Sequence, residues 1–254
     1  MKRYGIKIGE WTESILLLVI IAVIWSIWGT NGETNTLIMP SLKDVFQTFC
    51  TDVVDGSLLA ALGISMKRVL TGYVISAVLG IGLGIVIGLS KHMQRLTNLV
   101  IQIIRPIPPI AWIPLVILWM GIGEGSKVFL IFLGGFFPVL INVTDGIRYT
   151  DKKLTEVAAV METPRKKYIT QLVIPAAMPS IFTGLKVSLG SCWTCVVAAE
   201  LVASTSGIGY MISNARNFGQ MDVVIVGMLS IGVVGKIMDV ILNIIGKYVL
   251  AWNE

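Results

Sequence analysis

The chain has 254 residues, of which 55% are hydrophobic and only 14% are charged, and its formal net charge at pH 7 is +5. A mean hydropathy of +0.82 and several apolar stretches near twenty residues long predict an all-α membrane protein with about six transmembrane helices. A membrane protein is expected to carry a net positive charge, because its cytoplasmic loops are rich in lysine and arginine. The charge is therefore no sign of nucleic-acid binding, and we exclude nucleic acid as a partner. With His92 as its single histidine, the chain is expected to hold no metal site and no histidine-based catalytic centre.

The first predicted span follows a basic N-terminus. Three basic residues precede an apolar run over 11–29, which is too long for a signal peptide and is followed by no small-residue cleavage site. We therefore expect a membrane helix whose N-terminus is cytoplasmic. Residues 30–66 carry few basic side chains, so they are predicted to form an outside connection, with a short interfacial helix over about 42–54.

The second predicted span, about 70–89, carries a small residue at every fourth position. Such a stripe lets two helices approach until their backbones nearly touch. Two interpretations are equally open: the stripe packs against a helix of the same chain, or it contacts a second copy. Basic residues within 91–95 then predict a short cytoplasmic turn. The stripe consists of Gly72, Ser76, Gly80, Gly84 and Gly88.

The third predicted span, about 97–120, is interrupted by four prolines within nine residues. An uninterrupted helix is not expected there, because each proline lacks the N–H that a helix needs. A broken helix is tolerated at membrane depth only where protein or a water-filled cavity surrounds it. The stretch is therefore a candidate translocation path, although a purely structural kink is an equally good interpretation. The candidate path residues are Arg105, Pro106, Pro108, Pro109 and Trp112.

Three further spans complete the predicted bundle. After an outer turn at about 123–126, a fourth span over about 127–143 returns the chain to the cytoplasm, where basic residues gather before the next span. A fifth span lies at about 181–201. Residues 202–220 are predicted to form an outside loop. The sixth span lies at about 222–249.

Polar residues inside the last two spans have structural interpretations. Lys236 and Asp239 lie three residues apart, so they can pair on one helix face and neutralise each other. Cys192 and Cys195 are spaced C-x-x-C within an apolar span. We expect them to be small packing residues rather than a disulfide or a redox pair.

The polar segment 156–175 between the fourth and fifth spans is predicted to form a short helix, a turn and another short helix. Thr155 is expected to cap the first helix. Thr163 is expected to cap the second, with Pro164 at the first helical position. The segment is a polar surface where a membrane protein meets a cytosolic partner. The prolines expected to end the second helix are Pro175 and Pro179.

This segment resembles the EAA loop of ABC importer permeases, written EAA, three residues, Gly, nine residues and I-x-L-P. The spacing agrees at every step, with Leu172–Pro175 at the final positions. Glu162 stands where the family has glycine, so it must adopt the left-handed conformation or let the helix continue. The run from Arg105 to Glu124 also resembles the nitrate, sulfonate, taurine and bicarbonate branch of these permeases. The residues assigned to coupling are Glu156, Val157, Ala158, Ala159, Glu162 and Pro175.

The resemblance implies the type I ABC importer permease fold, as one transmembrane domain over 1–254 with its core at about 68–250 and a coupling loop at about 146–180. It implies as partners a cytosolic ABC ATPase dimer, an extracytoplasmic solute-binding protein and a second permease copy in a bacterial-type inner membrane. Both termini are then cytoplasmic. The chain has no G-x-x-x-x-G-K-[ST] phosphate loop. ATP and Mg are therefore expected only in the partner ATPase.

The branch resemblance implies a small, anionic solute such as a sulfonate, taurine, nitrate or bicarbonate. The alternative is a self-sufficient channel or an ion-coupled secondary transporter. Against it, the spans contain few charges suited to ion coupling, and the two halves show no inverted repeat.

Overall fold

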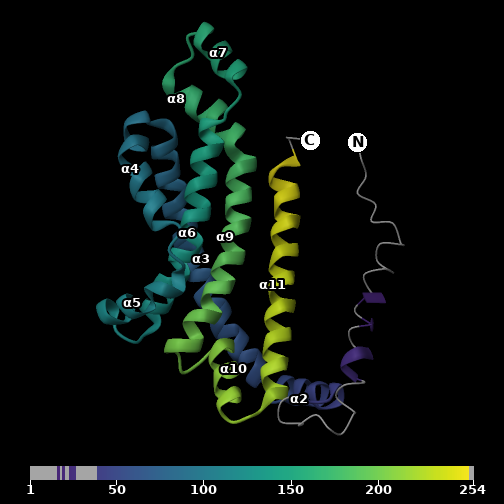
Figure 1. Ribbon diagram of the computed structural model, residues 1–254. Coiled ribbons are helices and arrows are strands. Elements are labelled where there is room, and N and C mark those ends of the chain that lie inside the picture. Colours follow the sequence, from purple (N-terminus) through teal and green to yellow (C-terminus); the bar gives the residue numbers. More distant parts are fainter. Residues whose placement is uncertain (1–15, 18, 21–22, 27–38, 252–254) are drawn as a thin grey trace. The chain divides into compact units, whose positions relative to one another are not determined.

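The structure, a computed structural model, describes residues 16–17, 19–20, 23–26 and 39–251 (Figure 1). The predicted first span, 11–29, lies mostly outside the described residues. Throughout the described part of the chain the regular elements are helices. They are α2 (Leu42–Val54), α3 (Ser57–Leu89), α4 (Lys91–Ile104), η1 (Pro109–Trp112), α5 (Ile113–Met120), α6 (Glu124–Arg148), α7 (Lys152–Val160), α8 (Arg165–Lys167), η2 (Tyr168–Val173), α9 (Ile174–Ala203), α10 (Ile208–Asn217) and α11 (Met221–Val249).

Four of the described helical stretches are long and apolar enough to cross a membrane: α3, the helix α6, the continuous run Arg165–Val202, and α11. They confirm the second, fourth, fifth and sixth predicted spans. The third predicted span is α4 followed by η1 and α5, and these two halves are bent by 87°. The predicted break is therefore present, and it counts as a fifth span if the bent pair crosses as one.

The chain divides into two compact units. One consists of the described residues of Met1–Ala60 together with Met211–Ser230, and the other of Ala61–Tyr210 with the described residues of Ile231–Glu254. In the first unit, the Thr48 hydroxyl donates to the Asp222 carboxylate at 2.6 Å. The second unit contains the broken span, the loop between α6 and α9, and every pocket described below.

The predicted short helix over 42–54 is confirmed as α2. Its start is set by a capping box, in which the Ser41 hydroxyl accepts from the Asp44 N–H and the Asp44 carboxylate accepts from the Ser41 N–H. The prediction that the connection continues to residue 66 is wrong. Gly56, at φ 81°, makes the turn, and the leucine- and alanine-rich sequence after it begins α3 at Ser57.

Two other predicted turns are shorter than expected. The basic residues of 91–95 lie in α4, because the Ser90 side chain caps this helix by accepting from the Met93 N–H at 3.3 Å. The outer turn expected at 123–126 is centred on Gly121, at φ 74°. Helix α6 already begins at Glu124.

The small-residue stripe of α3 faces α6 of the same chain. A Cβ placed on Gly80 would lie 2.8 Å from the Val139 Cβ, and one on Gly84 would lie 2.7 Å from the Val143 Cβ. Gly88 meets Ile147 in the same way, at 2.9 Å. Of the two open interpretations, the stripe therefore packs within the chain, where only glycine lets the two backbones come this close.

The core of the second unit lies between α3, α6, α9 and α11. One buried cluster gathers Val69, Ile131, Cys192, Trp193 and Met238, and the Cys192 Sγ lies 3.5 Å from the Ile131 carbonyl oxygen. Both cysteines of the C-x-x-C pair are free thiols. A second cluster joins α6 to the start of α9, with Val143, Ile147 and Val173 among its fully or nearly fully buried members.

The prediction that Pro175 and Pro179 end a helix is wrong. The π-helical segment η2 continues into α9 without a break, and the Ile174 N–H donates to the Ile169 carbonyl. Pro175 directly follows this π-helical segment, and Pro179 is accommodated inside α9. The predicted loop over 202–220 likewise contains a helix, α10, which follows Gly207 at φ 103°.

Candidate functional site

Helices α7 and α8 form a loop that projects beyond the ends of α6 and α9, away from α5 (Figure 1). Asp151, rather than the expected Thr155, caps α7, because its carboxylate accepts from the Lys153 N–H at 2.9 Å. At α8 the expected cap by Thr163 is also absent. Pro164 itself is the N-cap residue there, without a side-chain bond.

Glu162 turns the chain between α7 and α8. It has φ 47°, and it is the single non-glycine with positive φ among the described residues. The Glu162 N–H donates to the Ala159 carbonyl and the Thr163 N–H to the Ala158 carbonyl. Of its two possible conformations Glu162 therefore takes the left-handed one, so the helix ends where the family's glycine would end it.

One face of α7 is apolar and uncovered. Val160 is 85% exposed and Met161 73%, and Leu154 and Val157 are also exposed. We call these four residues the α7 apolar face. Of the residues assigned to coupling, Ala158 is buried, whereas Glu156, Val157, Ala159 and Glu162 are exposed. An uncovered apolar cluster outside the membrane spans is typical of a surface that binds another protein.

The loop is tied to the membrane helices through apolar contacts. Tyr168 and Leu172, four residues apart as the helical pattern predicts, both pack on the cluster around Val143 and Val173. Pro175 lies one turn further along. The loop therefore packs directly on α6 and on the start of α9.

The broken span contains a free cation. Arg105 caps the C-terminal end of α4, and four residues separate α4 from η1. Its side chain is exposed and makes no ion pair within the described part of the chain. An exposed arginine inside a span is expensive in hydrocarbon, so it must face water or protein.

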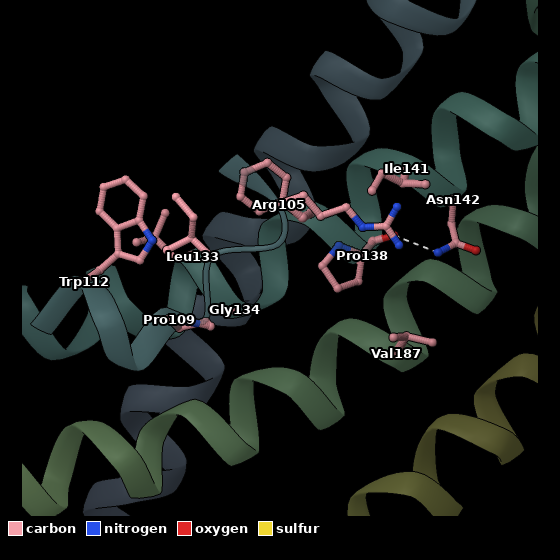
Figure 2. Close-up of a pocket in the computed structure, with 11 residues that line it drawn as sticks. Arg105, Pro109, Trp112, Leu133, Gly134, Pro138, Ile141, Asn142 and Val187 are labelled. Atoms are coloured by element: carbon pink, nitrogen blue, oxygen red, sulfur yellow. Dashed lines mark hydrogen bonds between the residues drawn. The ribbon is translucent and has the colours of Figure 1, made fainter. Parts of the chain in front are cut away.

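A cavity of about 260 Å³ lies at this break, which we call the proline pocket. Arg105, Pro109 and Trp112 line it from the break, while Phe137 and Asn142 line it from α6. Figure 2 shows the Arg105 side chain reaching along the pocket toward Asn142, whose amide donates to the Pro138 carbonyl at 2.8 Å. The pocket thus combines one cation and one amide with a wall of rings.

The other predicted path residues are divided between neighbouring cavities. Pro106 lines a polar cavity of about 500 Å³ between α4 and α6, which we call the polar pocket. Arg105 and Ile141 line both the proline pocket and the polar pocket, so these cavities meet at Arg105. Pro108 lines an apolar cavity of about 250 Å³ shared with Pro109.

Sequence reasoning missed a charge network in the second unit that is centred on the buried Arg68 and Glu200. Arg68 Nη1 donates to Glu200 Oε1 at 2.6 Å, and its other nitrogens bind the Glu124 carboxylate at 2.6 and 2.7 Å. Glu200 also accepts from the Ser65 hydroxyl and the Gly209 N–H. Arg68 and Glu200 each lie in a long apolar stretch. A charged residue in such a stretch needs a partner, and this was the signal in the sequence that could have revealed the network.

A second polar contact joins α9 to α11. The predicted pair of Lys236 and Asp239 is present at 3.8 Å. Asp239 also lies 3.5 Å from Lys186, which donates to Asn243 at 2.7 Å. The partner from α9 was not predicted. The two lysines share the Asp239 carboxylate, and the Lys186 contact joins α9 to α11.

Long apolar helices packed through glycine, a broken span with an exposed arginine that is unpaired within the described residues, and a projecting helical loop are typical of an integral membrane transport protein. Residues 76–250 match the family described as binding-protein-dependent transport system inner membrane component. The chain belongs to this family and is a permease subunit of an ABC importer.

Individual relatives cover nearly the whole chain. The chain is 39% identical over 253 residues to SsuC of Bacillus subtilis (strain 168), named as an aliphatic sulfonates transport permease protein, covering 100% of this chain and 90% of that protein. It is 30% identical to the taurine transport system permease protein TauC of Escherichia coli (strain K12), over 95% and 90% of the two chains. It is 33% identical to the nitrate import permease protein NrtB of Synechocystis sp., over 87% and 83%.

Proposed function

We propose that two copies of this chain form the translocation path for a small anionic solute across a bacterial-type inner membrane, with both termini cytoplasmic. A separate ABC ATPase dimer hydrolyses ATP with Mg on the cytosolic side, and an extracytoplasmic binding protein delivers the solute. The chain itself is a transport subunit without catalytic residues. The names of its relatives, which refer to sulfonates, taurine and nitrate, support an anionic solute.

The observation that carries the proposal is the α7 apolar face. It lies outside the spans, is uncovered in the isolated chain, and ends at the left-handed turn of Glu162. An ATPase that binds this face moves it when the ATPase dimer closes on ATP. The movement reaches α6 and α9 through Tyr168 and Leu172. ATP shifts the permease between two conformations because the ATPase binds the two with different affinity.

The proline pocket supplies the part of the path that this chain contributes. The uncompensated charge of Arg105 attracts an anion, and Asn142 offers a neutral polar partner close by. The surrounding wall, including Trp112 and Phe137, fits the non-polar part of an organic solute. Arg105 is a binding residue in this proposal, since no bond is made or broken.

The test is to purify the full chain with the ABC ATPase that accompanies it and to measure ATP-dependent uptake in liposomes. Glu156→Lys and Met161→Asp are expected to release the ATPase or to uncouple its hydrolysis from uptake. The first reverses a charge on α7, and the second places a charge on the α7 apolar face. Lys43→Asp on α2 is the matched control, since it changes the charge of an exposed residue elsewhere and is expected to leave uptake unchanged.

Two outcomes would contradict the proposal. If no ATPase accompanies the chain and the chain alone conducts solute, it is a channel or an ion-coupled transporter. If the control variant loses the ATPase to the same extent as Met161→Asp, the α7 apolar face is not the docking surface.

A further inference from the structure

The polar pocket is lined by a row of polar side chains from one helix. Helix α4 contributes Gln94, Asn98 and Gln102 at spacings of four residues, so they form one polar stripe facing α6. The other side of α4 carries exposed apolar residues, including Leu96 and Leu99. An amphipathic helix of this kind separates lipid from water, so the stripe faces an aqueous chamber.

The charges of this chamber do not cancel. Arg105 lies at its junction with the proline pocket, and Arg148 lies at the C-terminal end of α6. The one carboxylate in the lining is that of Asp145. Two guanidinium groups and one carboxylate leave a formal charge of +1, which a single monovalent anion neutralises. A divalent anion leaves a net charge of −1 and is therefore disfavoured.

Arg148 is held in place without being neutralised. With the Gln94 amide oriented so that its oxygen faces Arg148, this oxygen accepts from Nη1 and Nη2 at 2.7 and 3.0 Å. Within the described residues Arg148 makes no ion pair. The guanidinium is therefore positioned by a neutral partner and keeps its charge for a ligand.

We propose that the polar pocket is a second anion-binding site, specific for one monovalent oxyanion, which receives the solute's head group from Arg105 and holds it at Arg148. This inference rests on the proposed function and extends it. Because Arg105 lines both cavities, an anion moves between them without leaving a cationic partner. The chamber of about 500 Å³ has room for the anion together with water.

The proposal is tested by thiol chemistry in the full-length chain in lipid nanodiscs, in a Cys50→Ser background that removes the exposed native thiol. Asn98→Cys places a reporter in the chamber. An anionic methanethiosulfonate reagent carrying a sulfonate is expected to modify it at least about threefold faster than a cationic one carrying trimethylammonium. Methanesulfonate is expected to slow the modification at least about threefold, and sulfate less.

Matched variants separate the chamber from the general surface charge. Leu99→Cys, the neighbouring residue on the apolar side of α4, is expected to show no preference for the anionic reagent. Arg148→Gln is expected to abolish the preference at Asn98→Cys, whereas Arg148→Lys retains it. Asp145→Asn is expected to increase the preference and to let sulfate protect the thiol.

Several results would overturn the proposal. Equal rates with both reagents, no reaction with either, or the same preference at Leu99→Cys would each show that the pocket is not a selective anion site. None of these measurements needs the ATPase. Failure here would therefore leave the proposed function standing, whereas loss of ATPase association with an intact anion preference would overturn the proposed function alone.

Discussion

Arg68 and Glu200 form an ion pair of 2.6 Å in which both side chains are almost completely buried, at 3% and 0% exposed. They lie 132 residues apart in the sequence and join α3 to α9. Ser65 completes the contact by donating its hydroxyl to Glu200 and accepting from the Ile208 N–H. A Cβ on Gly207 would collide with the Glu200 carboxylate, so the approach to α10 depends on this glycine.

Removing one member of this pair is expected to destabilise the protein strongly. Glu200→Ala leaves the buried Arg68 charge with only the exposed carboxylate of Glu124, and such a loss costs about 3–5 kcal/mol. The measurement is the midpoint of heat-induced loss of the monodisperse peak in detergent. Lys43→Ala, an exposed position, is expected to change stability by less than about 0.5 kcal/mol. A midpoint for Glu200→Ala equal to that of the control would contradict the prediction.

The α3–α6 contact predicts opposite effects for two neighbouring glycines. Gly84→Ala places a methyl group 2.7 Å from the Val143 Cβ and 3.1 Å from the Leu140 carbonyl oxygen, so it is expected to cost about 1–3 kcal/mol through overpacking. Gly82 meets nothing within 4 Å. Gly82→Ala is therefore expected to stabilise α3 by up to about 1 kcal/mol. Thermal midpoints of the two variants that move in the same direction would show that the stripe does not pack on α6.

The left-handed turn at Glu162 predicts how the loop between α7 and α8 responds to substitution. Glu162→Gly is expected to preserve the turn, because glycine adopts positive φ without steric cost. Glu162→Val is expected to disrupt it, since a β-branched residue strongly disfavours this conformation. The measurement is limited trypsin digestion at the basic residues of α8, with cleavage faster in Glu162→Val. Equal digestion of the two variants would mean that the turn does not depend on φ at this position.

Asp52 predicts a dependence of stability on pH. Burial raises the pKa of its carboxyl above the ordinary value of 3.8, and the nearby charges of Asp55 and Asp222 raise it further. The folded state therefore binds the proton more tightly than the unfolded state. The stability contributed by this group is complete below the ordinary pKa and is lost as the pH rises through the raised one. Asp52→Asn is expected to raise the thermal midpoint at pH 7 and to have a much smaller effect at pH 3.5.

Asp55 provides the control of opposite sign. The Ser57 N–H donates to its carboxylate at 2.8 Å and lowers the pKa of Asp55. This stability is present above the ordinary pKa and is lost as the pH falls through the lowered one. Asp55→Asn is thus expected to lower the midpoint at pH 7. If Asp52→Asn also lowers it, the carboxylate of Asp52 is not destabilising in the folded protein.

Most of the helices could be predicted from the sequence, because long apolar runs in a membrane protein leave few alternatives to a helix. The break at Arg105 and its neighbouring prolines followed from the missing N–H groups alone. The ends of the helices were harder. Asp151 and Thr155 are both good capping residues, and the sequence does not say which one the chain uses.

The features that the sequence did not predict depend on contacts between residues far apart in the chain. Arg68 binds Glu124 and Glu200, which lie 56 and 132 residues away in the sequence. No local sequence pattern predicts such pairs. Pro175 was expected to stop a helix, yet the helix continues through it, directly after a π-helical turn. For Glu162 the two possible conformations could be stated in advance, but the choice required the structure.

The helical run Arg165–Val202 connects the loop between α6 and α9 to the far end of α9. Its 38 residues, at 1.5 Å each, span about 57 Å, with Glu200 near one end and α8 at the other. If this helix moves as a rigid body in the proposed function, a small tilt at α8 becomes a larger sideways motion at Glu200. In the proposed function, that motion reaches Arg68 and Gly209, which are both hydrogen-bonded to Glu200, so a push received at the α7 apolar face is transmitted along one continuous helix.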